Sequence, residues 1–336
     1  MTRRIAINGF GRIGRMVFRI LEEQSDIEVV GINDLTDPKT LAHLLEFDSV
    51  HGRFGKSVSA EDGAIVVGDR RVPTFAQRNP AEIPWADLGV ELVLECTGVF
   101  RNKETASGHL QAGAKAVILS APAKGDVDAT IVMGVNDDTL DMTKHTIVSN
   151  GSCTTNCLAP VVKVLDEAFG LNHGLVTTIH SYTNDQRLLD LPHSDLRRGR
   201  AAACSMVPTS TGAAAAIGLV IPHLAGKLDG IAVRVPTPNV SLVDLVAQLD
   251  KPTTAAEVLD TIRAATTGTM DGVLAIEDKP LVSTDYIGNP YSSIVDADNV
   301  MVMNGQTVKI LSWYDNEWGF SCRMVDLARR MLQGIN

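Results

Sequence analysis

The sequence predicts an α/β protein that contains two different sheets. In the first half, short β-prone runs alternate with helical or loop segments, which is typical of a parallel, doubly wound sheet. In the second half, longer β-prone stretches, Val240–Leu249 and Val308–Trp313, predict a large mixed, mostly antiparallel sheet in an α+β domain. A chain of 336 residues has the length for two such domains.

The composition excludes several functional classes. Hydrophobic residues make up 45% of the chain, so it can bury substantial cores, and with aromatics at only 4% these cores are aliphatic. A formal net charge of −10 argues against nucleic acid as the main partner. Five cysteines without a regular framework fit a reducing compartment, and we expect neither a signal peptide nor a membrane span. We therefore expect a cytoplasmic protein without membrane contact, and we assign no metal site.

The first elements in chain order form a nucleotide-binding pattern. A β-prone run is followed by a G-x-G-x-x-G turn and then by apolar residues at helical spacing. Gly9 allows the tight turn, Gly11 lets the backbone approach a pyrophosphate, and Gly14 lets the helix pack on the strand. A second β run, Ile27–Asn33, ends at Asp34, whose carboxylate suits the hydroxyls of an adenosine ribose. The pattern therefore predicts a dinucleotide site with the pyrophosphate at the helix N-terminus.

Further β-prone runs complete the expected parallel sheet. They are Val90–Cys96, Ala116–Ser120, Ala129–Val135 and Thr146–Ser149. A helix is expected over Leu41–Asp48, and helical or loop segments, including Lys103–Ala112, lie between these runs. Because a doubly wound sheet binds its ligand at the carboxyl ends of the strands, we expect the site at that edge.

The stretch Ser149–Pro160, with the sequence SNGSCTTNCLAP, surrounds Cys153 with hydroxyl and amide side chains. A structural cysteine usually lies in an apolar run, so this polar setting suits a reactive thiol, but a lone cysteine leaves both alternatives open, a reactive thiol and a core residue. If a helix begins near Ser152, its N–H groups and dipole favour the thiolate. Pro160 leaves two alternatives open, a helix kinked at Pro160 or a helix that begins there. His180 lies at the end of the next β run, and it supports the interpretation of Cys153 as a reactive thiol if the fold brings the two side chains close together.

The segments after His180 contain groups suited to anions. The following loop contains arginines and aspartates, which form either a solvated surface or a site. Ser210-Thr211-Gly212 precedes an Ala-rich helix expected over Ala213–Ile221, and a hydroxyl with a glycine at a helix start is either a small anion site or an N-cap.

A β-prone run over Gly230–Pro236 contains one arginine. Its alternation predicts that Ile231, Val233 and Val235 lie on the core face and Arg234 on the other. An arginine there, near other anion-binding groups, suits a phosphate because its guanidinium donates two parallel N–H bonds.

Seven segments, in chain order, together resemble one family. They are INGFGRIGR, SNGSCTTNCLAP, HSYTNDQ, LRRGRAAA, STGAA, RVPTPNVS and SWYDNEWG. In these segments, and over essentially the whole chain, the sequence resembles the phosphorylating, NAD-dependent glyceraldehyde-3-phosphate dehydrogenases. Gly151 and Ala215 depart from the residues common in that family, Ala and Lys, at positions that carry no chemistry.

The resemblance implies a domain organisation and an assembly. A Rossmann NAD-binding domain is expected over residues 1–151, with the C-terminal helix 318–336 packed back on it. A catalytic domain is expected over residues 152–317. The resemblance also implies a homotetramer.

The resemblance implies a reaction as well. D-Glyceraldehyde 3-phosphate is oxidised to 1,3-bisphosphoglycerate with NAD and inorganic phosphate, a step of glycolysis and gluconeogenesis. Cys153 attacks the aldehyde as a thiolate, and the thiohemiacetal becomes a thioester that phosphate cleaves. His180 stabilises the thiolate as an ion pair and then acts as acid and base.

The binding residues also follow from the resemblance. The substrate phosphate is expected at Thr183, Arg234 and Asp185. The attacking phosphate is expected at Ser152, Thr154, Arg198, Thr211 and Gly212. The cofactor is expected to touch Gly9, Gly11, Arg12, Ile13, Gly14, Asp34, Arg78, Ser120 and Asn316. Asp34 would repel the 2′-phosphate of NADP, so NAD is the expected cofactor.

Three other functions stay open at this point. Erythrose-4-phosphate dehydrogenase is similar in fold and in the cysteine–histidine pair, although Thr211-Gly212 and RVPTPNVS look more like the glyceraldehyde-3-phosphate enzyme. A thiol hydrolase or acyltransferase would need no nicotinamide, and the glycine-rich turn with Asp34 argues against it. A binding protein without turnover would not need both Cys153 and His180.

Overall fold

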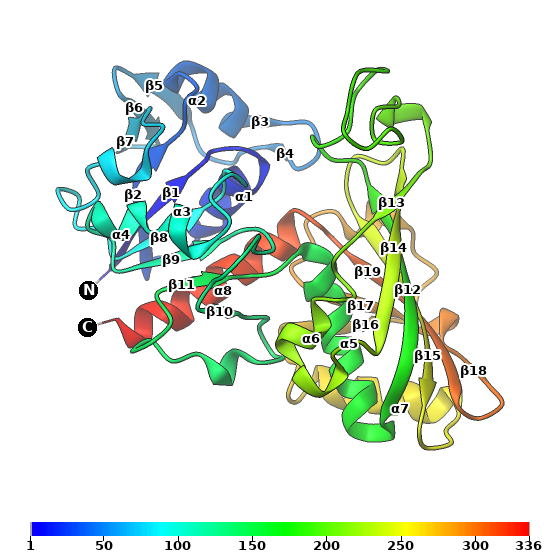
Figure 1. Ribbon diagram of the computed structural model, residues 1–336. Helices are drawn as coiled ribbons and strands as arrows, with labels where there is room; N and C mark the ends of the chain where they lie inside the picture. Colours follow the sequence, from blue (N-terminus) through cyan, green and yellow to red (C-terminus); the bar gives the residue numbers. More distant parts are fainter. Residues whose placement is uncertain (1, 336) are drawn as a thin grey trace. The chain divides into compact units, whose positions relative to one another are not determined.

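The computed structural model describes residues 2–335 (Figure 1). They divide into two compact units, and each is described by itself. The first unit comprises the described residues up to Ile131, Asp137–Gly151 and those from Ser321 onward. The second comprises Val132–Asn136 and Ser152–Phe320. Every helix within residues 2–335 is too short or too polar to span a bilayer.

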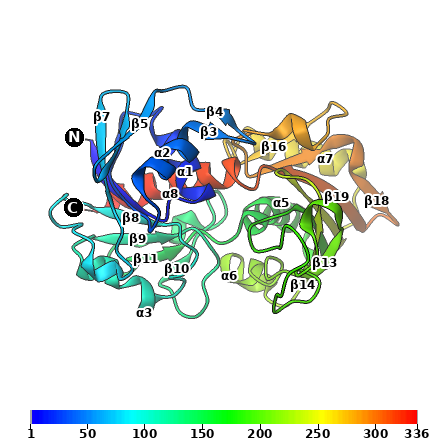
Figure 2. The same cartoon turned by 90° about the horizontal axis from the view of Figure 1, so that it is seen from above.

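A nine-stranded sheet forms the centre of the first unit, in the order β10-β11-β9-β8-β1-β2-β7-β6-β5 (Figures 1 and 2). Its strands are β1 (Arg3–Asn8), β2 (Ile27–Asn33), β5 (Val58–Glu61), β6 (Ala64–Val67), β7 (Arg70–Phe75), β8 (Leu92–Glu95), β9 (Ala116–Leu119), β10 (Ala129–Thr130) and β11 (Ile147–Ser149). The strands from β10 to β7 pair in parallel, whereas β5, β6 and β7 pair antiparallel. All four residues of β8 and of β9 are buried, as expected for strands covered on both faces. The predicted doubly wound parallel sheet is confirmed.

The first unit also contains helices. They are α1 (Arg12–Leu21), α2 (Pro38–Glu46), α3 (Lys103–Ala106), α4 (Gly108–Gln111) and the part of α8 (Trp318–Gly334) from Ser321. The Asp37 side chain accepts a hydrogen bond from the Thr40 amide and caps α2, so this helix begins before the predicted Leu41. Within Lys103–Ala112, expected to be helical or loop, the two short helices α3 and α4 are separated by Ser107. A two-stranded ribbon, β3 (Phe47–Asp48) with β4 (Gly52–Arg53), follows α2.

An eight-stranded sheet forms the second unit, in the order β13-β14-β12-β15-β19-β17-β16, with β18 also paired to β19 (Figure 1). Its strands are β12 (Leu171–Ser181), β13 (Val207–Ser210), β14 (Leu228–Val235), β15 (Ser241–Leu249), β16 (Leu274–Glu277), β17 (Ser293–Asp296), β18 (Met301–Met303) and β19 (Thr307–Tyr314). The pairs β12–β14 and β16–β17 are parallel and the other pairs are antiparallel. The predicted mixed, mostly antiparallel sheet is confirmed.

Helices cover this sheet and share its core. They are α5 (Cys153–Phe169), α6 (Ile217–Val220) and α7 (Ala255–Thr266). Apolar residues of α5 such as Leu158 and Leu165 are buried with Val258 and Ile262 of α7 in one cluster with the strands. Short 3₁₀ turns connect the elements of both units: η1 (Pro80–Glu82), η2 (Asp137–Thr139), η3 (Ala202–Cys204), η4 (Pro222–Leu224), η5 (Ser283–Tyr286) and η6 (Ala297–Asn299).

Three predicted details are wrong. The strand expected over Ala129–Val135 ends at Thr130, because Val132 and Val135 pack in the core of the second unit. Of the helix expected over Ala213–Ile221, only Ile217–Val220 is α-helical, and turns precede it. On β14 the face assignment is reversed, since Ile231 is 50% exposed and Ala232 is buried, which puts Arg234 on the inner face with Ala232.

The three glycines of the first turn have different roles. Gly9 has a φ of +92°, and a Cβ there would lie 2.6 Å from the Thr97 amide nitrogen. A Cβ on Gly14 would lie 2.2 Å from the Gly9 carbonyl oxygen, so Gly14 permits the close packing of α1 on the turn. A Cβ on Gly11 would meet nothing within 4 Å. Gly9 and Gly14 are therefore required by the fold, whereas the space at Gly11 is available to a ligand.

This difference predicts opposite behaviour for two matched variants. Gly14→Ala should lower the free energy of unfolding by roughly 2–3 kcal/mol, because the new methyl group overlaps a backbone oxygen. Gly11→Ala should change it by less than about 0.5 kcal/mol, because the backbone of Gly11 is allowed for alanine and the space is empty. Urea unfolding of both variants beside the unmutated chain checks this, and equal destabilisation by the two would contradict it.

Candidate functional site

A pocket of about 390 Å³ lies at the carboxyl ends of β1, β2 and β8 in the first unit. It is lined by Asn8, Gly9, Gly11, Asn33, Asp34, Leu35, Gln77, Arg78, Cys96, Thr97, Val99 and Phe100. The sequence-predicted residues Gly9, Gly11, Asp34 and Arg78 are therefore brought together. The pocket occupies the edge of the sheet where doubly wound folds bind their ligands.

The Asp34 carboxylate is oriented by the backbone around it. Its Oδ2 accepts a hydrogen bond from the Phe10 amide at 2.8 Å, and its Oδ1 accepts from the Thr36 amide at 2.9 Å. These contacts fix the carboxylate beside the glycine-rich turn, and each oxygen keeps a lone pair for a ribose hydroxyl. The open space at Gly11 and the first turn of α1 supply the room and the N–H groups that a pyrophosphate needs. The residues present thus fit a dinucleotide.

Five other predicted cofactor residues lie outside the lining of this pocket: Arg12, Ile13, Gly14, Ser120 and Asn316. The Arg12 side chain is paired with Asp48, so only the backbone of Arg12 is left for the predicted cofactor contact. Ile13 follows in the first turn of α1. Ser120 directly follows β9, and its amide donates to the Glu95 carbonyl at 3.0 Å.

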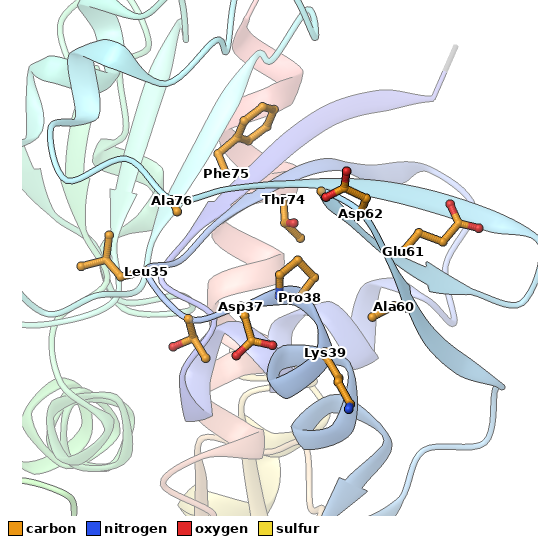
Figure 3. A pocket seen from close by; sticks show the side chains of 12 residues that line it. Leu35, Asp37, Pro38, Lys39, Ala60, Glu61, Asp62, Thr74, Phe75 and Ala76 are labelled. Atoms are coloured by element: carbon orange, nitrogen blue, oxygen red, sulfur yellow. The ribbon is translucent and has the colours of Figure 1, made fainter.

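A larger hollow of about 840 Å³ lies beside this pocket (Figure 3). Two of its labelled carboxylates are already engaged: Asp37 caps α2, and Glu61 forms an ion pair with Arg71 at 3.2 Å. It contains neither the glycine-rich turn nor Asp34. Size alone therefore does not identify the dinucleotide site.

A cysteine–histidine pair lies in the second unit. Cys153 is the first residue of α5, and its Sγ lies 3.5 Å from Nε2 of His180, near the end of β12. The Ser152 Oγ accepts a hydrogen bond from the Thr155 amide at 2.9 Å and caps the helix. Pro160 lies inside the helix, so the helix begins at Cys153 and not at Pro160. The predicted proximity of Cys153 and His180 is confirmed.

Arg234 contacts the other side of the histidine ring. Because β12 and β14 are parallel and in register, His180 lies opposite Arg234. His180 Nδ1 lies 2.8 Å from the Ser181 carbonyl oxygen, which only accepts, so the proton of the neutral ring lies on Nδ1 and Nε2 is the free acceptor beside Cys153. Arg234 Nη1 lies 2.5 Å from the same Nδ1 and donates to the Ser181 carbonyl oxygen at 3.1 Å. The sequence predicted an arginine turned away from the core, but the guanidinium is directed at the catalytic candidate.

The surroundings shift the pKa values of both members of the pair. Although Cys153 as a whole is only half-buried, enclosure of its sulfur raises the pKa of the thiol, while the charge of Arg234 and hydrogen bonds from Thr154 act in the opposite direction. Burial, and then the charge of Arg234, lower the pKa of His180 to about 3. The predicted lowering of the Cys153 pKa is wrong for the free chain, because burial outweighs the helix N-terminus. His180 is therefore a neutral base at physiological pH.

Tyr314, at the end of β19, was missed by the sequence analysis. Its hydroxyl lies 2.9 Å from Thr154 Oγ1 and 2.8 Å from Thr178 Oγ1, and its ring packs edge-on against His180 with centroids 6.0 Å apart. Burial raises the pKa of Tyr314 far above its usual value. The residue lies in the SWYDNEWG segment, but its contacts come from strands distant in sequence, so no local pattern singles it out. Tyr314 fixes the start of α5 against β12.

Arg198 is held by its own loop. Nη1 lies 2.5 Å from Asp185 Oδ2, Nε donates to Thr209 Oγ1 at 2.9 Å, and Nη2 donates to the Ser210 carbonyl at 3.2 Å. Asp185 is therefore the partner of Arg198, and its carboxylate would repel the substrate phosphate expected there. Thr183 precedes this pair in the loop, and its amide donates to Gln186 at 3.3 Å.

The remaining predicted residues also belong to the second unit. Thr211 Oγ1 accepts from the Ala213 amide at 3.2 Å, which leaves its O–H free to donate, and a Cβ on Gly212 would meet nothing within 4 Å. The Asn316 side-chain oxygen accepts from the hydroxyls of Ser181 at 2.9 Å and Ser241 at 2.8 Å. These bonds leave the Asn316 amide hydrogens for a ligand.

Both units have counterparts among known families. The chain matches the sequence model described as glyceraldehyde 3-phosphate dehydrogenase, NAD binding domain, over residues 3–103. It matches the model described as glyceraldehyde 3-phosphate dehydrogenase, C-terminal domain, over residues 152–316.

Similar proteins cover the chain almost completely. Glyceraldehyde-3-phosphate dehydrogenase 1 of Bacillus cereus is 59% identical over 331 residues, which is 98% of each chain. The glyceraldehyde-3-phosphate dehydrogenase of Geobacillus stearothermophilus is 57% identical over 328 residues, again 98% of each chain. The chromosomal glyceraldehyde-3-phosphate dehydrogenase of Cupriavidus necator is 57% identical over 331 residues and 98% of each chain.

The Rossmann-type first unit and the cysteine–histidine pair of the second define an NAD-dependent dehydrogenase. The two matched models and the near-complete relatives make the family specific. The chain belongs to the glyceraldehyde-3-phosphate dehydrogenase family.

The buried neutral His180 predicts a dependence of stability on pH. A histidine in the unfolded chain binds a proton below about pH 6.5, whereas His180 in the folded chain binds one only near pH 3. The contribution of His180 to the free energy of unfolding is therefore fully present above pH 6.5 and is lost as the pH falls toward 3. Between pH 7 and pH 5, the unmutated chain should lose ~2 kcal/mol more stability than His180→Asn. Urea unfolding at the two pH values measures this difference.

The control is His173→Asn, which removes an exposed histidine from the same strand. Between the two pH values, His173→Asn should lose as much stability as the unmutated chain. An equal acid-induced loss for His180→Asn and the unmutated chain would show that His180 is not held neutral.

Proposed function

We propose that the chain catalyses the phosphorylating oxidation of D-glyceraldehyde 3-phosphate to 1,3-bisphosphoglycerate with NAD and inorganic phosphate. The observation that supports this most directly is the Cys153 sulfur at the start of α5, 3.5 Å from a neutral His180 whose other ring nitrogen faces Arg234. A nucleophile, a base and an anion-binding cation are thus adjacent. NAD, when bound, accepts the hydride that leaves the substrate carbon.

The first chemical step joins the sulfur to the aldehyde. Cys153 Sγ forms a bond to the carbonyl carbon while the thiol proton passes to His180 Nε2, and the carbonyl oxygen then takes a proton from that nitrogen to give the thiohemiacetal. The lowered pKa of His180 keeps its ring unprotonated at neutral pH, so Nε2 has a lone pair for the thiol proton, and the proton moves as the sulfur–carbon bond forms. Because burial raises the thiol pKa in the free chain, we expect the thiolate to form during attack and not beforehand.

The second step forms the thioester. His180 Nε2 removes the hydroxyl proton of the thiohemiacetal as the hydride departs, and the carbon–oxygen double bond forms again. The amide hydrogens of Asn316, whose oxygen is fixed by Ser181 and Ser241, are suited to orient a carboxamide. An oxygen of inorganic phosphate then attacks the thioester carbon, and the Cys153 sulfur leaves as a thiolate that recovers a proton from His180.

Two anion sites serve this chemistry. For the substrate phosphate we propose Arg234 and Thr183. For the attacking phosphate we propose Arg198, Thr211, Gly212 and Ser152, because the Thr211 hydroxyl keeps its proton for donation and Gly212 leaves open space. A phosphate contact from Thr154 stays a prediction, since its hydroxyl is already bonded to Tyr314.

We further propose that the two units are the NAD-binding and catalytic domains of a cytoplasmic homotetramer. Large apolar side chains exposed on the loop after β12 support self-association, including Leu188 at 76% and Leu196 at 86% exposure. Leu175 and Ile231, on paired strands of the second sheet, are 69% and 50% exposed. Light scattering at micromolar concentration measures the assembly directly. Five free cysteines fit a reducing compartment.

The role of phosphate gives the test of the proposed function. Without phosphate, one turnover should release about one equivalent of NADH per site, and the thioester should then persist. Added phosphate should restart turnover. Thr211→Ala should raise the phosphate concentration needed about tenfold and leave the burst intact, because acylation precedes phosphate attack. Stopped-flow absorbance of NADH measures both phases.

Thr211→Ser is the matched control, because it keeps the hydroxyl and its hydrogen bond to Ala213. It should behave like the unmutated enzyme. Sustained turnover without phosphate, with free carboxylic acid as the product, would contradict the second anion site.

The contact between Arg234 and the substrate phosphate predicts a substrate-dependent loss. Arg234→Leu should lower kcat/KM for glyceraldehyde 3-phosphate. The fall should correspond to a loss of roughly 2–4 kcal/mol of transition-state stabilisation, as for loss of a charge-assisted contact. The kcat/KM for unphosphorylated glyceraldehyde should fall much less. Because Arg234 also touches His180, the rate of Cys153 alkylation should be measured in the same variant. Equal losses for both substrates would indicate that Arg234 acts only on His180.

A further inference from the structure

A buried polar network lies beside the nucleotide pocket, and its central members have no part in the chemistry proposed above. Glu95, the last residue of β8, is 2% exposed, and His109 of α4 is fully buried. Burial of a carboxylate is costly unless it is hydrogen-bonded, so its partners require an explanation.

Four donors converge on the Glu95 carboxylate. Its Oε2 accepts from Asn8 Nδ2 at 2.5 Å and lies 3.1 Å from His109 Nε2. Its Oε1 accepts from the Thr97 amide at 2.8 Å and from the Thr97 hydroxyl. An ionised carboxylate has about four acceptor positions, so this set of donors occupies all of them.

The orientation of His109 follows from its other neighbour. The indole Nε1 of Trp85 lies 3.0 Å from His109 Nδ1, and an indole nitrogen only donates. His109 Nδ1 is therefore the acceptor, and the ring proton on Nε2 is directed at Glu95. Every polar side-chain atom of Glu95, His109 and Trp85 therefore has a hydrogen-bond partner.

The network reaches the pocket on two sides. On one side, Asn8 Oδ1 accepts from Asn33 Nδ2 at 2.7 Å, and the Asn33 side chain bonds both the amide and the carbonyl of Gln77, at 2.8 and 2.9 Å. On the other side, Thr97 Oγ1 accepts from the Val99 amide at 3.0 Å. Asn8, Asn33, Gln77, Thr97 and Val99 all line the pocket.

The Thr97 end of the segment Thr97–Phe100 has little apolar packing. Thr97 is exposed and Val99 is 71% exposed, so apolar burial contributes little to holding them. The Phe100 ring packs edge-on against His109, with centroids 6.3 Å apart. The Phe100 ring also packs against the apolar cluster of Ala106, Val117, Leu119 and Ile147. The hydrogen bonds to Glu95 therefore hold the Thr97 end of this wall, and ring packing holds the Phe100 end.

We propose that Glu95, oriented by His109, is a positioning residue for the adenosine end of the cofactor. It fixes Thr97–Phe100 directly, and it fixes Gln77 through Asn8 and Asn33, in the arrangement that binds the nucleotide. The adenosine end is assigned because Asp34 lines the same pocket. The proposal rests on the proposed function only for the identity of the cofactor, NAD.

The test begins at Thr97, because an exposed isosteric change leaves the fold intact. Thr97→Val removes the hydroxyl that bonds both Glu95 and the Val99 amide. The dissociation constants of NAD and of AMP, measured by calorimetry, should both rise about tenfold. The rate of Cys153 alkylation without nucleotide should stay unchanged, because Cys153 belongs to the second unit. Thr97→Ser, which restores the hydroxyl, should return both dissociation constants to within about twofold.

A double-mutant cycle separates positioning from direct contact. Glu95→Gln replaces an acceptor by a donor at a buried site that touches no ligand. If Thr97 acts through Glu95, the double variant should bind NAD no more weakly than the weaker of the two single variants. If Thr97 contacts the nucleotide independently, the two effects should multiply, and the proposal is wrong.

The control for a general loss of stability is Ser293→Ala. It breaks a buried hydrogen bond of 2.7 Å to Ser312 in the second unit and should lower Tm without changing either dissociation constant. Unchanged nucleotide binding in Thr97→Val would overturn the proposal, whatever its Tm. Failure of the unmutated chain to oxidise glyceraldehyde 3-phosphate would reject the proposed function but leave these binding measurements valid.

Discussion

The chemistry of the second unit depends on where α5 begins. The Ser152 cap places Cys153 at the first helical position, so that the sulfur faces β12 and the free N–H groups of the helix. The register of β12 with β14 then fixes His180 beside Arg234. If α5 began one turn later, the thiol would lie in a loop, and neither the helix N-terminus nor Tyr314 would orient it. One capping hydrogen bond and one strand register together define the geometry of the reacting atoms.

Both units solve the same physical problem in the same way. Each buries ionisable or polar side chains next to a place where a ligand is expected, and each satisfies them with donors from strands distant in sequence. In the second unit, Tyr314 joins Thr154 on α5 to Thr178 on β12. In the first, Glu95 joins β1, β8 and α4. Such networks contribute little net stability, but they allow one arrangement of the surrounding loops.

The sequence was most informative where function requires a local pattern. The glycine-rich turn, the alternation of elements and the Cys153 segment predicted both sheets and the reactive pair, because each is encoded within a few residues. The contacts of Tyr314, of Glu95 and of Arg234 with His180 connect strands far apart, so no spacing reveals them. The side of β14 that faces inward was mispredicted for a similar reason. Valines and isoleucine usually mark the core face, but here the inner face has the small Ala232 and the functional Arg234.

The positions of the three tryptophans have a practical consequence. Trp85 is fully buried in the first unit, and its indole is bonded to His109. Trp313 and Trp318 belong to the second unit, where Trp313 stacks on Tyr286 with ring centroids 5.4 Å apart. Intrinsic fluorescence therefore has separate sources in the two units. A chain with Trp85 replaced by phenylalanine emits only from the second unit, so the difference between the two spectra isolates the environment of the Glu95–His109 network and makes its opening visible without any added label.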